Sequence, residues 1–269
     1  MSLSVQGKTA IVTGAGCGVG LAIARHLVDR GARVMFADSD ENTLMAELGE
    51  VPGGDSPIRS FVADMGERLA LANLVSATID AFDRVDILVN AHRLVRRGDP
   101  LDTDTDILED MMRQNMMASL RLSQLVARRM IKQADAEENR PDEAGAIINI
   151  STLAGSRPIP DMLGYSIACA ALDQATRGLA LALAPHRIRV NGVSISSVMT
   201  QHLKSAIRED PELRQRVIDG TPMGRIAVPD ETVDTVLYLA SSGAGFVTGQ
   251  IIGVDGGRSV ADPVTALAL

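Results

Sequence analysis

Short β-branched segments alternate with amphipathic helical patterns along almost the whole chain of 269 residues. Strands separated by helices pair in parallel, because each helix carries the chain back to the end of the sheet where the next strand begins. This alternation predicts an α/β fold, a doubly wound parallel sheet of about seven strands with helices on both faces. The predicted strands are residues 8–13, 32–37, 57–63, 86–89, 146–151, 188–193 and 251–254.

Helical patterns fill most of the intervals between these strands. The chain contains no low-complexity linker or internal repeat, so residues 1–269 are expected to form a single domain. The polar, weakly helical segment 199–225 is expected to form a lid over a substrate site. The predicted helices are residues 21–30, 67–82, 105–133, 163–184 and 230–240.

The composition is acidic, with 26 Lys and Arg residues against 34 Asp and Glu residues and a net charge of −8. Such a surface repels phosphate backbones and anionic lipids, and aromatic residues at 2% leave few stacking platforms for bases. No apolar run approaches the ~20 residues of a membrane span. We therefore expect no nucleic-acid or membrane partner. Two cysteines and no signal-peptide pattern predict a cytoplasmic location.

A glycine-rich turn, TGAGCGVG, lies between the first strand and the first helix and contains Gly14, Gly18 and Gly20. Glycines let the backbone turn sharply and approach a pyrophosphate, which the free N–H groups of the helix N-terminus can bind. Asp38 ends the second strand, where a carboxylate accepts hydrogen bonds from a ribose 2′-hydroxyl. Alone, the turn could be a mere connector and Asp38 an exposed turn residue. Together they predict a dinucleotide site.

The glycine turn resembles the T-G-x-x-x-G-x-G motif of the short-chain dehydrogenase/reductase family, and the likeness extends over nearly the whole chain. Asp64 resembles the family's adenine-contacting Asp, and residues 86–90 (DILVN) resemble the strand that enters its N-N-A-G motif. Asn115, Tyr165 and residues 246–257 (FVTGQIIGVDGG) resemble its helix Asn, its catalytic Tyr and its last strand. The resemblance implies a single-domain Rossmann-fold oxidoreductase that transfers hydride between NAD(H) and a small alcohol or carbonyl compound.

The resemblance also implies a role for each matching residue. Tyr165 would be the acid/base, Thr152 or its neighbour Ser151 would hold the substrate oxygen, and Asn115 would support a proton-relay water. The implied cofactor-binding residues are Gly14, Gly16, Cys17, Gly18, Val19, Gly20, Asp38, Ser39, Asp64, Met65, Asn90, Ala91, Tyr165 and Thr200.

NAD(H) is predicted in preference to NADP(H). Family members that favour NADP tend to place a basic residue inside the glycine turn or just after the second strand. This chain has Cys17 and Ser39 there, and the Asp38 carboxylate would repel a 2′-phosphate.

The nicotinamide end departs from the family pattern. The family's Y-x-x-x-K reads Tyr165-Ser166-Ile167-Ala168-Cys169, so a cysteine stands at the lysine position. The chain has only three lysines, Lys8, Lys132 and Lys204, and none lies in the predicted helix 163–184. In addition, the family's serine is Thr152, its N-A-G is Ala91-His92-Arg93, and its P-G after the sixth strand is Ile195-Ser196.

Loss of the lysine should weaken proton transfer by Tyr165. A unit charge ~4 Å away at an effective dielectric of ~20 contributes roughly 4 kcal/mol, or about three pKa units. Without it, a tyrosine with a pKa of about 10 is only about 0.1% ionised at pH 7. Arg93 is the local cation that could occupy the lysine's space. It could equally be a solvent-facing loop residue, or obstruct the nicotinamide half of the site.

The sequence thus carries two interpretations. The first is an NAD-dependent oxidoreductase of this family with an altered active site, acting on a small alcohol or carbonyl compound. The alternative is a catalytically silent dinucleotide-binding protein, a sensor or structural partner. The resemblance further implies a dimer or tetramer built through the helices at about 105–133 and 163–184. The four histidines show no metal-ligand spacing, so no metal site is predicted.

Overall fold

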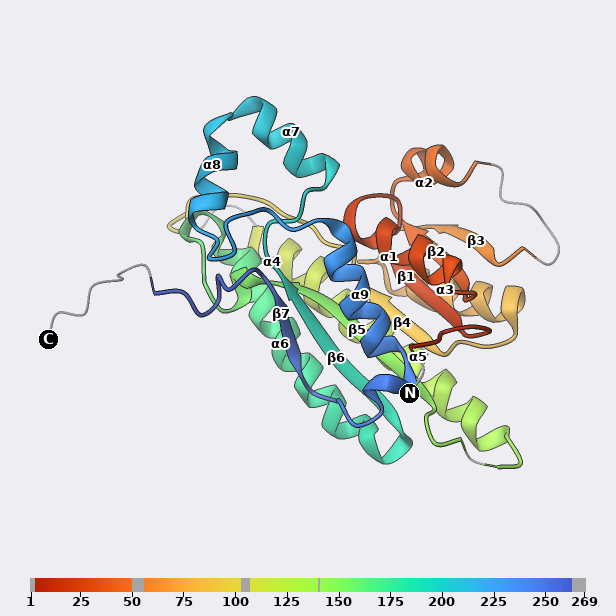
Figure 1. Ribbon diagram of the computed structural model, residues 1–269. Helices are drawn as coiled ribbons and strands as arrows, with labels where there is room; N and C mark the ends of the chain where they lie inside the picture. Colours follow the sequence, from red (N-terminus) through yellow and green to blue (C-terminus); the bar gives the residue numbers. More distant parts are fainter. Residues whose placement is uncertain (1–2, 50–55, 103–106, 140, 263–269) are drawn as a thin grey trace, which may run out of the picture.

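A parallel seven-stranded sheet with the order β3-β2-β1-β4-β5-β6-β7 forms the centre of the molecule (Figure 1). The computed structural model describes residues 3–49, 56–102, 107–139 and 141–262. Each predicted strand is present to within two residues at either end, and the doubly wound fold is confirmed. The strands are β1 (Thr9–Thr13), β2 (Arg33–Asp38), β3 (Ile58–Val62), β4 (Ile87–Asn90), β5 (Gly145–Thr152), β6 (Ile188–Ile195) and β7 (Ile251–Val254).

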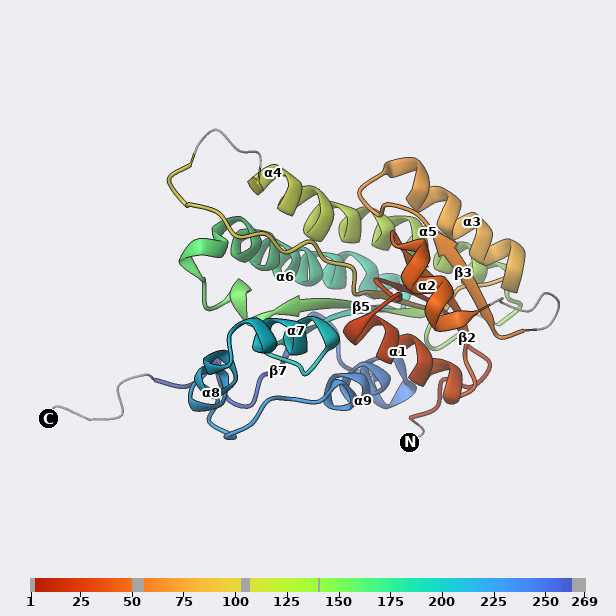
Figure 2. The ribbon, with the colours of Figure 1, turned by 90° about the horizontal axis from the view of Figure 1, so that it is seen from above.

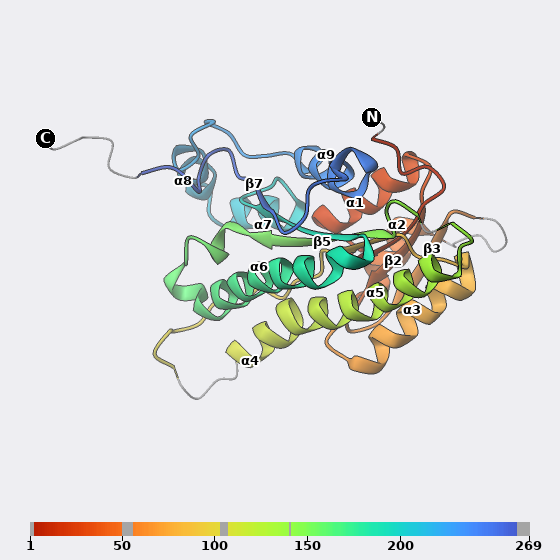
Figure 3. The same ribbon diagram turned by 90° about the horizontal axis from the view of Figure 1, so that it is seen from below.

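Helices cover both faces of the sheet, as Figures 2 and 3 show from opposite sides. On one face lie α1 (Gly18–Asp29) and α9 (Pro229–Ala240), which contact each other. On the other face lie α3 (Arg68–Phe82), α5 (Ala118–Ala136) and α6 (Leu163–Leu183). One buried apolar cluster lies under each layer of helices, because the β-branched strands are apolar on both faces.

The predicted long helix 105–133 is interrupted. Its start at 105 lies outside the described residues, and the rest consists of α4 (Ile107–Met111), a π-helical turn (Met112–Met117) and α5. In the π turn the Ala118 N–H donates to the Arg113 carbonyl, five residues earlier. A continuous helix was therefore the wrong prediction here. Single-turn π segments often occur at functional sites, and this one contains Asn115.

Three further helices lie outside the predicted helices. The helix α2 (Glu41–Leu48) follows β2, and the Asp40 side chain caps it by accepting from the Thr43 N–H at 3.2 Å. The weakly helical segment 199–225 contains α7 (Gln201–Glu209) and α8 (Glu212–Asp219), which stand beside the carboxyl ends of the strands (Figure 1). A β-bridge between Val198 and Ala227 closes the base of this segment.

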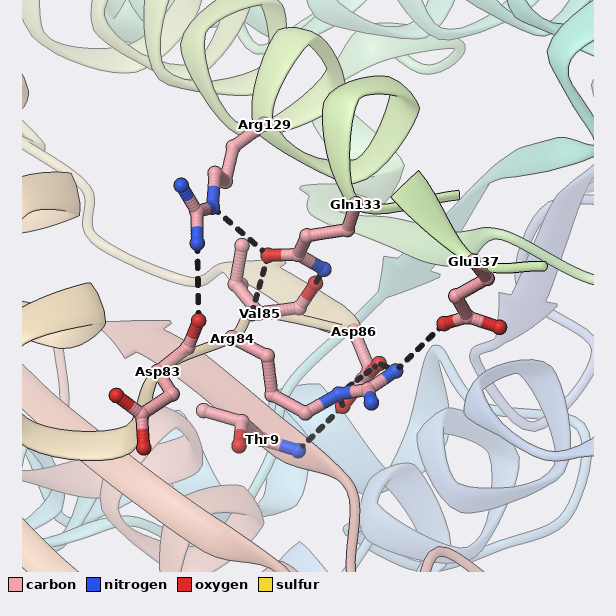
Figure 4. A network of polar contacts seen from close by, with 8 residues as sticks. All are labelled: Thr9, Asp83, Arg84, Val85, Asp86, Arg129, Gln133 and Glu137. Carbon is pink, nitrogen blue, oxygen red and sulfur yellow. Dashed lines mark hydrogen bonds and ion pairs between the residues drawn. The ribbon is translucent and has the colours of Figure 1, made fainter. Parts of the chain in front are cut away.

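The start of β4 is held by a polar network at the amino ends of the strands (Figure 4). The Asp86 carboxylate is 4% exposed, accepts from the Thr9 N–H at 2.8 Å and pairs with Arg84. Gln133 on α5 bonds both backbone groups of Val85, at 3.0 Å to its N–H and 2.9 Å to its carbonyl oxygen. These contacts fix β4 between β1 and α5, and thereby position the residues that follow its carboxyl end.

One segment, Pro160–His186, is long and apolar enough to span a membrane by length and composition. It contains α6, and the core helix of a soluble protein passes the same test. The inward side of α6 carries buried residues from Tyr165 to Ala180, so this side packs against the sheet and the neighbouring helix.

Candidate active site

A groove of about 860 Å³ runs across the carboxyl ends of the strands, within the ~300–1,000 Å³ typical of small-molecule sites. Most of the residues predicted to bind cofactor line this groove. They lie at or after the ends of four strands, except Thr200, which caps the N-terminus of α7. These are Gly14, Cys17, Gly18, Val19, Gly20, Asp38, Ser39, Asp64, Met65, Ala91 and Thr200. Gly16, Asn90 and Tyr165 are not among the lining residues.

The glycine turn has a backbone that side chains would disrupt. Gly14 has φ +66°, and an added Cβ would lie 2.7 Å from the Cα atom of His92. At Gly20 an added Cβ would lie 2.0 Å from the Gly14 carbonyl oxygen. The twelve-residue helix α1 begins at Gly18, and no side chain caps its N-terminus. Its free N–H groups and its dipole can therefore receive the negative charge of a pyrophosphate.

Asp38 faces the groove at the end of β2. Its carboxylate accepts from the Gly16 N–H at 2.8 Å and from the Asp40 N–H at 3.1 Å. Gly16 thus supports Asp38 from behind instead of lining the groove. Ser39 lines the groove beside it. Neither the glycine turn nor position 39 holds a basic residue that could neutralise the carboxylate.

Asp64 lies at the end of β3 and faces the same groove. Its Oδ1 atom accepts from the Gly66 N–H and from the Gln114 side-chain Nε2, each at 2.7 Å. Burial opposes ionisation of Asp64, but these two hydrogen bonds and Arg113 outweigh it, so its pKa lies below the usual value. Gln114 could not be singled out from the sequence, because its partner is 50 residues away in the chain.

Asn90 lies behind the groove at the end of β4 and is 1% exposed. Its side chain donates to Asn149 Oδ1 at 2.8 Å and to Ser123 Oγ at 3.1 Å. Asn149 in turn donates to the Thr176 hydroxyl at 2.8 Å. This network ties β4 and β5 to α5 and α6, so the Asn90 side chain supports the sheet.

His92 joins the glycine turn to the π-helical turn. Its Nε2 is 3.0 Å from the Gln114 carbonyl oxygen, which can only accept, so Nε2 carries the proton. Its Nδ1 therefore accepts from the Thr13 hydroxyl at 2.6 Å. The oxygen of that hydroxyl accepts in turn from the Ala91 N–H at 3.1 Å. Burial of the ring lowers the pKa of His92 to about 4, although part of the residue lines the groove. The imidazole is therefore neutral at pH 7.

Tyr165, Thr152 and Cys169 lie together beside the groove. Tyr165 is 5% exposed and Cys169 is 4% exposed, in an apolar cluster with Met111, Ala154 and Ala168. Thr152 Oγ1 is 3.4 Å from Cys169 Sγ. Burial, and next the Cys169 sulfur, raise the pKa of Tyr165 to about 12, against the lowering effects of Arg93 and of the Thr152 hydroxyl. Burial also raises the pKa of the Cys169 thiol, which supplies no positive charge.

Arg93 is an exposed residue that lines the groove. Its guanidinium lowers the pKa of Tyr165, and it lowers the pKa of Cys17 against the stronger raising effects of burial and Asp38. Its positive potential therefore reaches both the glycine turn and the phenol. Arg93 is thus exposed, and whether it takes the place of the family's lysine stays a prediction.

Asn115 holds the segment that follows β4. Its Oδ1 accepts from the Leu94 N–H at 2.7 Å, and its Nδ2 donates to the Leu94 carbonyl oxygen at 2.8 Å. Leu94 packs against the cluster around Tyr165. The side chain of Asn115 thus positions the loop that lies between Tyr165 and the groove. Ser151 is 1% exposed and lies beside Asp173 on α6.

The described residues fit a bound dinucleotide. Gly14 and Gly20 leave no room for a Cβ, α1 presents an uncapped N-terminus, and Asp38 and Asp64 offer carboxylates along the same groove. Within the described part of the chain, no group of three or more His, Cys, Asp or Glu side chains could hold a metal ion.

Comparisons with known proteins agree with this geometry. The family described as enoyl-(acyl carrier protein) reductase matches residues 14–259. The chain is 34% identical to galactitol 2-dehydrogenase (L-tagatose-forming) of Cereibacter sphaeroides over 95% of this chain and 96% of that protein. It is 31% identical to L-xylulose reductase of Bos taurus over 96% of this chain and 98% of that protein.

Solved structures extend the likeness to three dimensions. 7α-Hydroxysteroid dehydrogenase, complexed with NADH and 7-oxo glycochenodeoxycholic acid, superposes with a TM-score of 0.85. It is 30% identical to this chain over 95% of each. The chain therefore belongs to the short-chain dehydrogenase/reductase family, whose members are oxidoreductases that transfer hydride to or from an alcohol or carbonyl carbon.

Proposed function

We propose that this protein is an NAD(H)-dependent oxidoreductase of a small alcohol or carbonyl compound, in which proton transfer by Tyr165 is slow at neutral pH. The observation that carries the proposal is the pairing of an intact groove for the ADP portion with a buried Tyr165 that has a pKa of about 12. The relatives named for galactitol and L-xylulose make polyols and ketoses the first substrates to test.

In this proposal Tyr165 moves the proton and Thr152 orients the substrate oxygen by a hydrogen bond. Bound NAD(H) supplies or accepts the hydride. During reduction the phenol O–H of Tyr165 donates its proton to the forming alkoxide, so the neutral phenol is the reactive form. During oxidation the phenolate must accept the alcohol proton, so the rare ionised form is needed.

The high pKa of Tyr165 affects both directions. With a pKa of about 12, a fraction on the order of 10⁻⁵ of Tyr165 is ionised at pH 7, which is about a hundredfold less than for a phenol of pKa 10. The phenol itself is fully protonated there. The high pKa therefore slows both directions: it makes the phenol a weaker acid for reduction, and it leaves little phenolate to act as the base in oxidation.

Rates in both directions test this proposal. Binding of NADH and NADPH is titrated first, and then oxidation and reduction are measured from pH 7 to pH 10 on a polyol and ketose panel. We expect oxidation to rise about tenfold per pH unit while reduction stays nearly constant. Tyr165→Phe should abolish both activities while NADH still binds. NADH binding without reduction of any substrate would favour a silent dinucleotide-binding protein instead.

Cofactor choice belongs to the same proposal. The Asp38 carboxylate accepts from the Gly16 and Asp40 N–H groups, which orient it toward a ribose 2′-hydroxyl. A 2′-phosphate would meet this negative charge without a basic side chain in the turn. We therefore expect the same titration to give a lower Kd for NADH than for NADPH. Equal affinities would contradict the assignment of Asp38.

We also propose a homo-oligomer, a single-domain protein and a cytoplasmic location. Leu163, Ile167 and Leu181 are exposed along the outer side of α6, and an apolar side of this kind suits a second copy of the chain.

The segment that contains α7 and α8 is proposed to be the lid over the substrate. Two free cysteines suit a reducing compartment.

A further inference from the structure

Gln114 lies in the groove at the proposed adenine end, although nothing in the sequence pointed to it. Its side chain lines the groove, and its Nε2 donates to Asp64 Oδ1 at 2.7 Å. The same Oδ1 accepts from the Gly66 N–H. The other carboxylate oxygen, Oδ2, is 3.9 Å from Arg113 Nη1 and remains available as an acceptor.

The Asp64 carboxylate fixes which way the Gln114 amide faces. A carboxylate in its ionised form only accepts hydrogen bonds, so the amide nitrogen must face it and the amide oxygen must face away. The pKa of Asp64 lies below its usual value, so the carboxylate is ionised at neutral pH. Among the described residues, no group donates to the Gln114 amide oxygen.

The backbone of Gln114 is also held in place. Its carbonyl oxygen accepts from Nε2 of His92, whose Nδ1 is bonded to the Thr13 hydroxyl. The backbone of Gln114, in the π-helical turn, is therefore tied to the glycine turn through His92 and Thr13. A hydrogen-bonding side chain mounted on a fixed backbone can select a ligand, because little is lost when it becomes ordered.

From this arrangement we infer that Gln114 is a specificity-determining residue for the base, and that with Asp64 it selects a 6-aminopurine over a 6-oxopurine. The inference rests on the proposed dinucleotide binding. Asp64 Oδ2 and the Gln114 amide oxygen are both acceptors, and the exocyclic amino group of adenine brings two N–H donors. Hypoxanthine carries a carbonyl oxygen at that position, which would meet two acceptors. The amide cannot turn to donate to that oxygen without facing its own oxygen toward Asp64.

The test compares binding of NADH with binding of its hypoxanthine analogue, reduced nicotinamide hypoxanthine dinucleotide. Both have the same nicotinamide, so nicotinamide fluorescence follows both titrations and no catalytic turnover is needed. Wild type should bind NADH at least about tenfold more tightly, because an unpaired acceptor in a binding site typically costs that much. Gln114→Met has nearly the same volume without polar atoms, and should reduce this preference about fivefold or more.

Gln201→Met is the matched control. Gln201 lines the same groove but lies on α7, so this variant should keep the wild-type ratio. A wild-type ratio near one, or a ratio that Gln114→Met leaves within twofold, would overturn the role of Gln114 alone. Failure of wild type to bind either dinucleotide would overturn dinucleotide binding itself, and this inference with it.

Discussion

His92 joins two separate segments of the chain at the edge of the groove. It stands where the family pattern has a small residue, and both of its ring nitrogens are bonded inside the protein. Because the folded state holds the neutral ring, the pKa of His92 falls from 6.5 to about 4. A lowered pKa stabilises the fold above the unfolded value, and this contribution is lost as the pH falls from 6.5 to about 4.

This linkage predicts an acid-sensitive step in stability. Between pH 6.5 and about 4, His92 should account for a loss on the order of 2–3 kcal/mol in the free energy of unfolding, discounted because part of the residue reaches the groove. In His92→Asn the free energy of unfolding should depend less steeply on pH over this range, by an amount that corresponds to at most about one bound proton. Urea unfolding at several pH values measures it. The exposed His202, changed to Asn, should keep the wild-type slope, and an equal flattening there would refute the assignment.

At the scale of elements, the polar network at the start of β4 predicts that replacing Gln133 destabilises the fold more than replacing an exposed glutamine does. Val85 is 0% exposed, and both of its backbone groups bond to Gln133 (Figure 4). Gln133→Leu preserves volume but leaves a buried N–H and a buried carbonyl unpaired, which should cost about 2–4 kcal/mol of stability. Chemical denaturation measures the loss. Gln215→Leu on the exposed side of α8 should cost less than about 0.5 kcal/mol, and similar losses for the two variants would contradict the role of the network.

The elements also separate what the sequence could predict from what it could not. The strands were predictable because each is a short apolar run between turn residues, and the position of Asp38 followed from the end of β2. The π-helical turn was not, since its hydrogen-bond pattern depends on groups packed around it and not on local periodicity. Helix α2 is short and begins with polar residues, so its local pattern gives little helical signal, although Asp40 caps it.

The candidate site shows the same division. The family resemblance implied that Tyr165, Thr152 and Cys169 belong to one site, and they do lie together, because α6 packs against the end of β5. The side chains of Asn90 and Asn115 face inward, toward the sheet network and Leu94, which spacing along the chain cannot reveal. Gln114 gains its importance from Asp64 on a different strand.

Across the whole molecule, the sheet gathers distant residues at one edge. Residues at the carboxyl ends of β1 to β6 line the groove, while α6 contributes the phenol of Tyr165 beside it and β5 contributes Thr152. Helix α6 carries Tyr165 on its inner side and exposed leucines on its outer side, so the proposed oligomer contact and the proton-transfer residue share one helix. The fold of the family is therefore retained, and the residue beside the phenol, Cys169, carries no positive charge.

The pKa of Tyr165 measures directly what the absence of a cation at position 169 does to the phenol. The chain has two tyrosines and no tryptophan, so phenolate absorbance is read without interference, and subtraction of the Tyr165→Phe titration isolates Tyr165. We expect wild-type Tyr165 to stay protonated beyond pH 10.5, in line with its pKa of about 12, and Arg93→Gly to move ionisation further upward. Cys169→Lys should lower the pKa by about two to three units, the effect of a cation ~4 Å away. A wild-type Tyr165 that ionises near pH 7 to 8, or a pKa that Cys169→Lys leaves unchanged, would contradict the account.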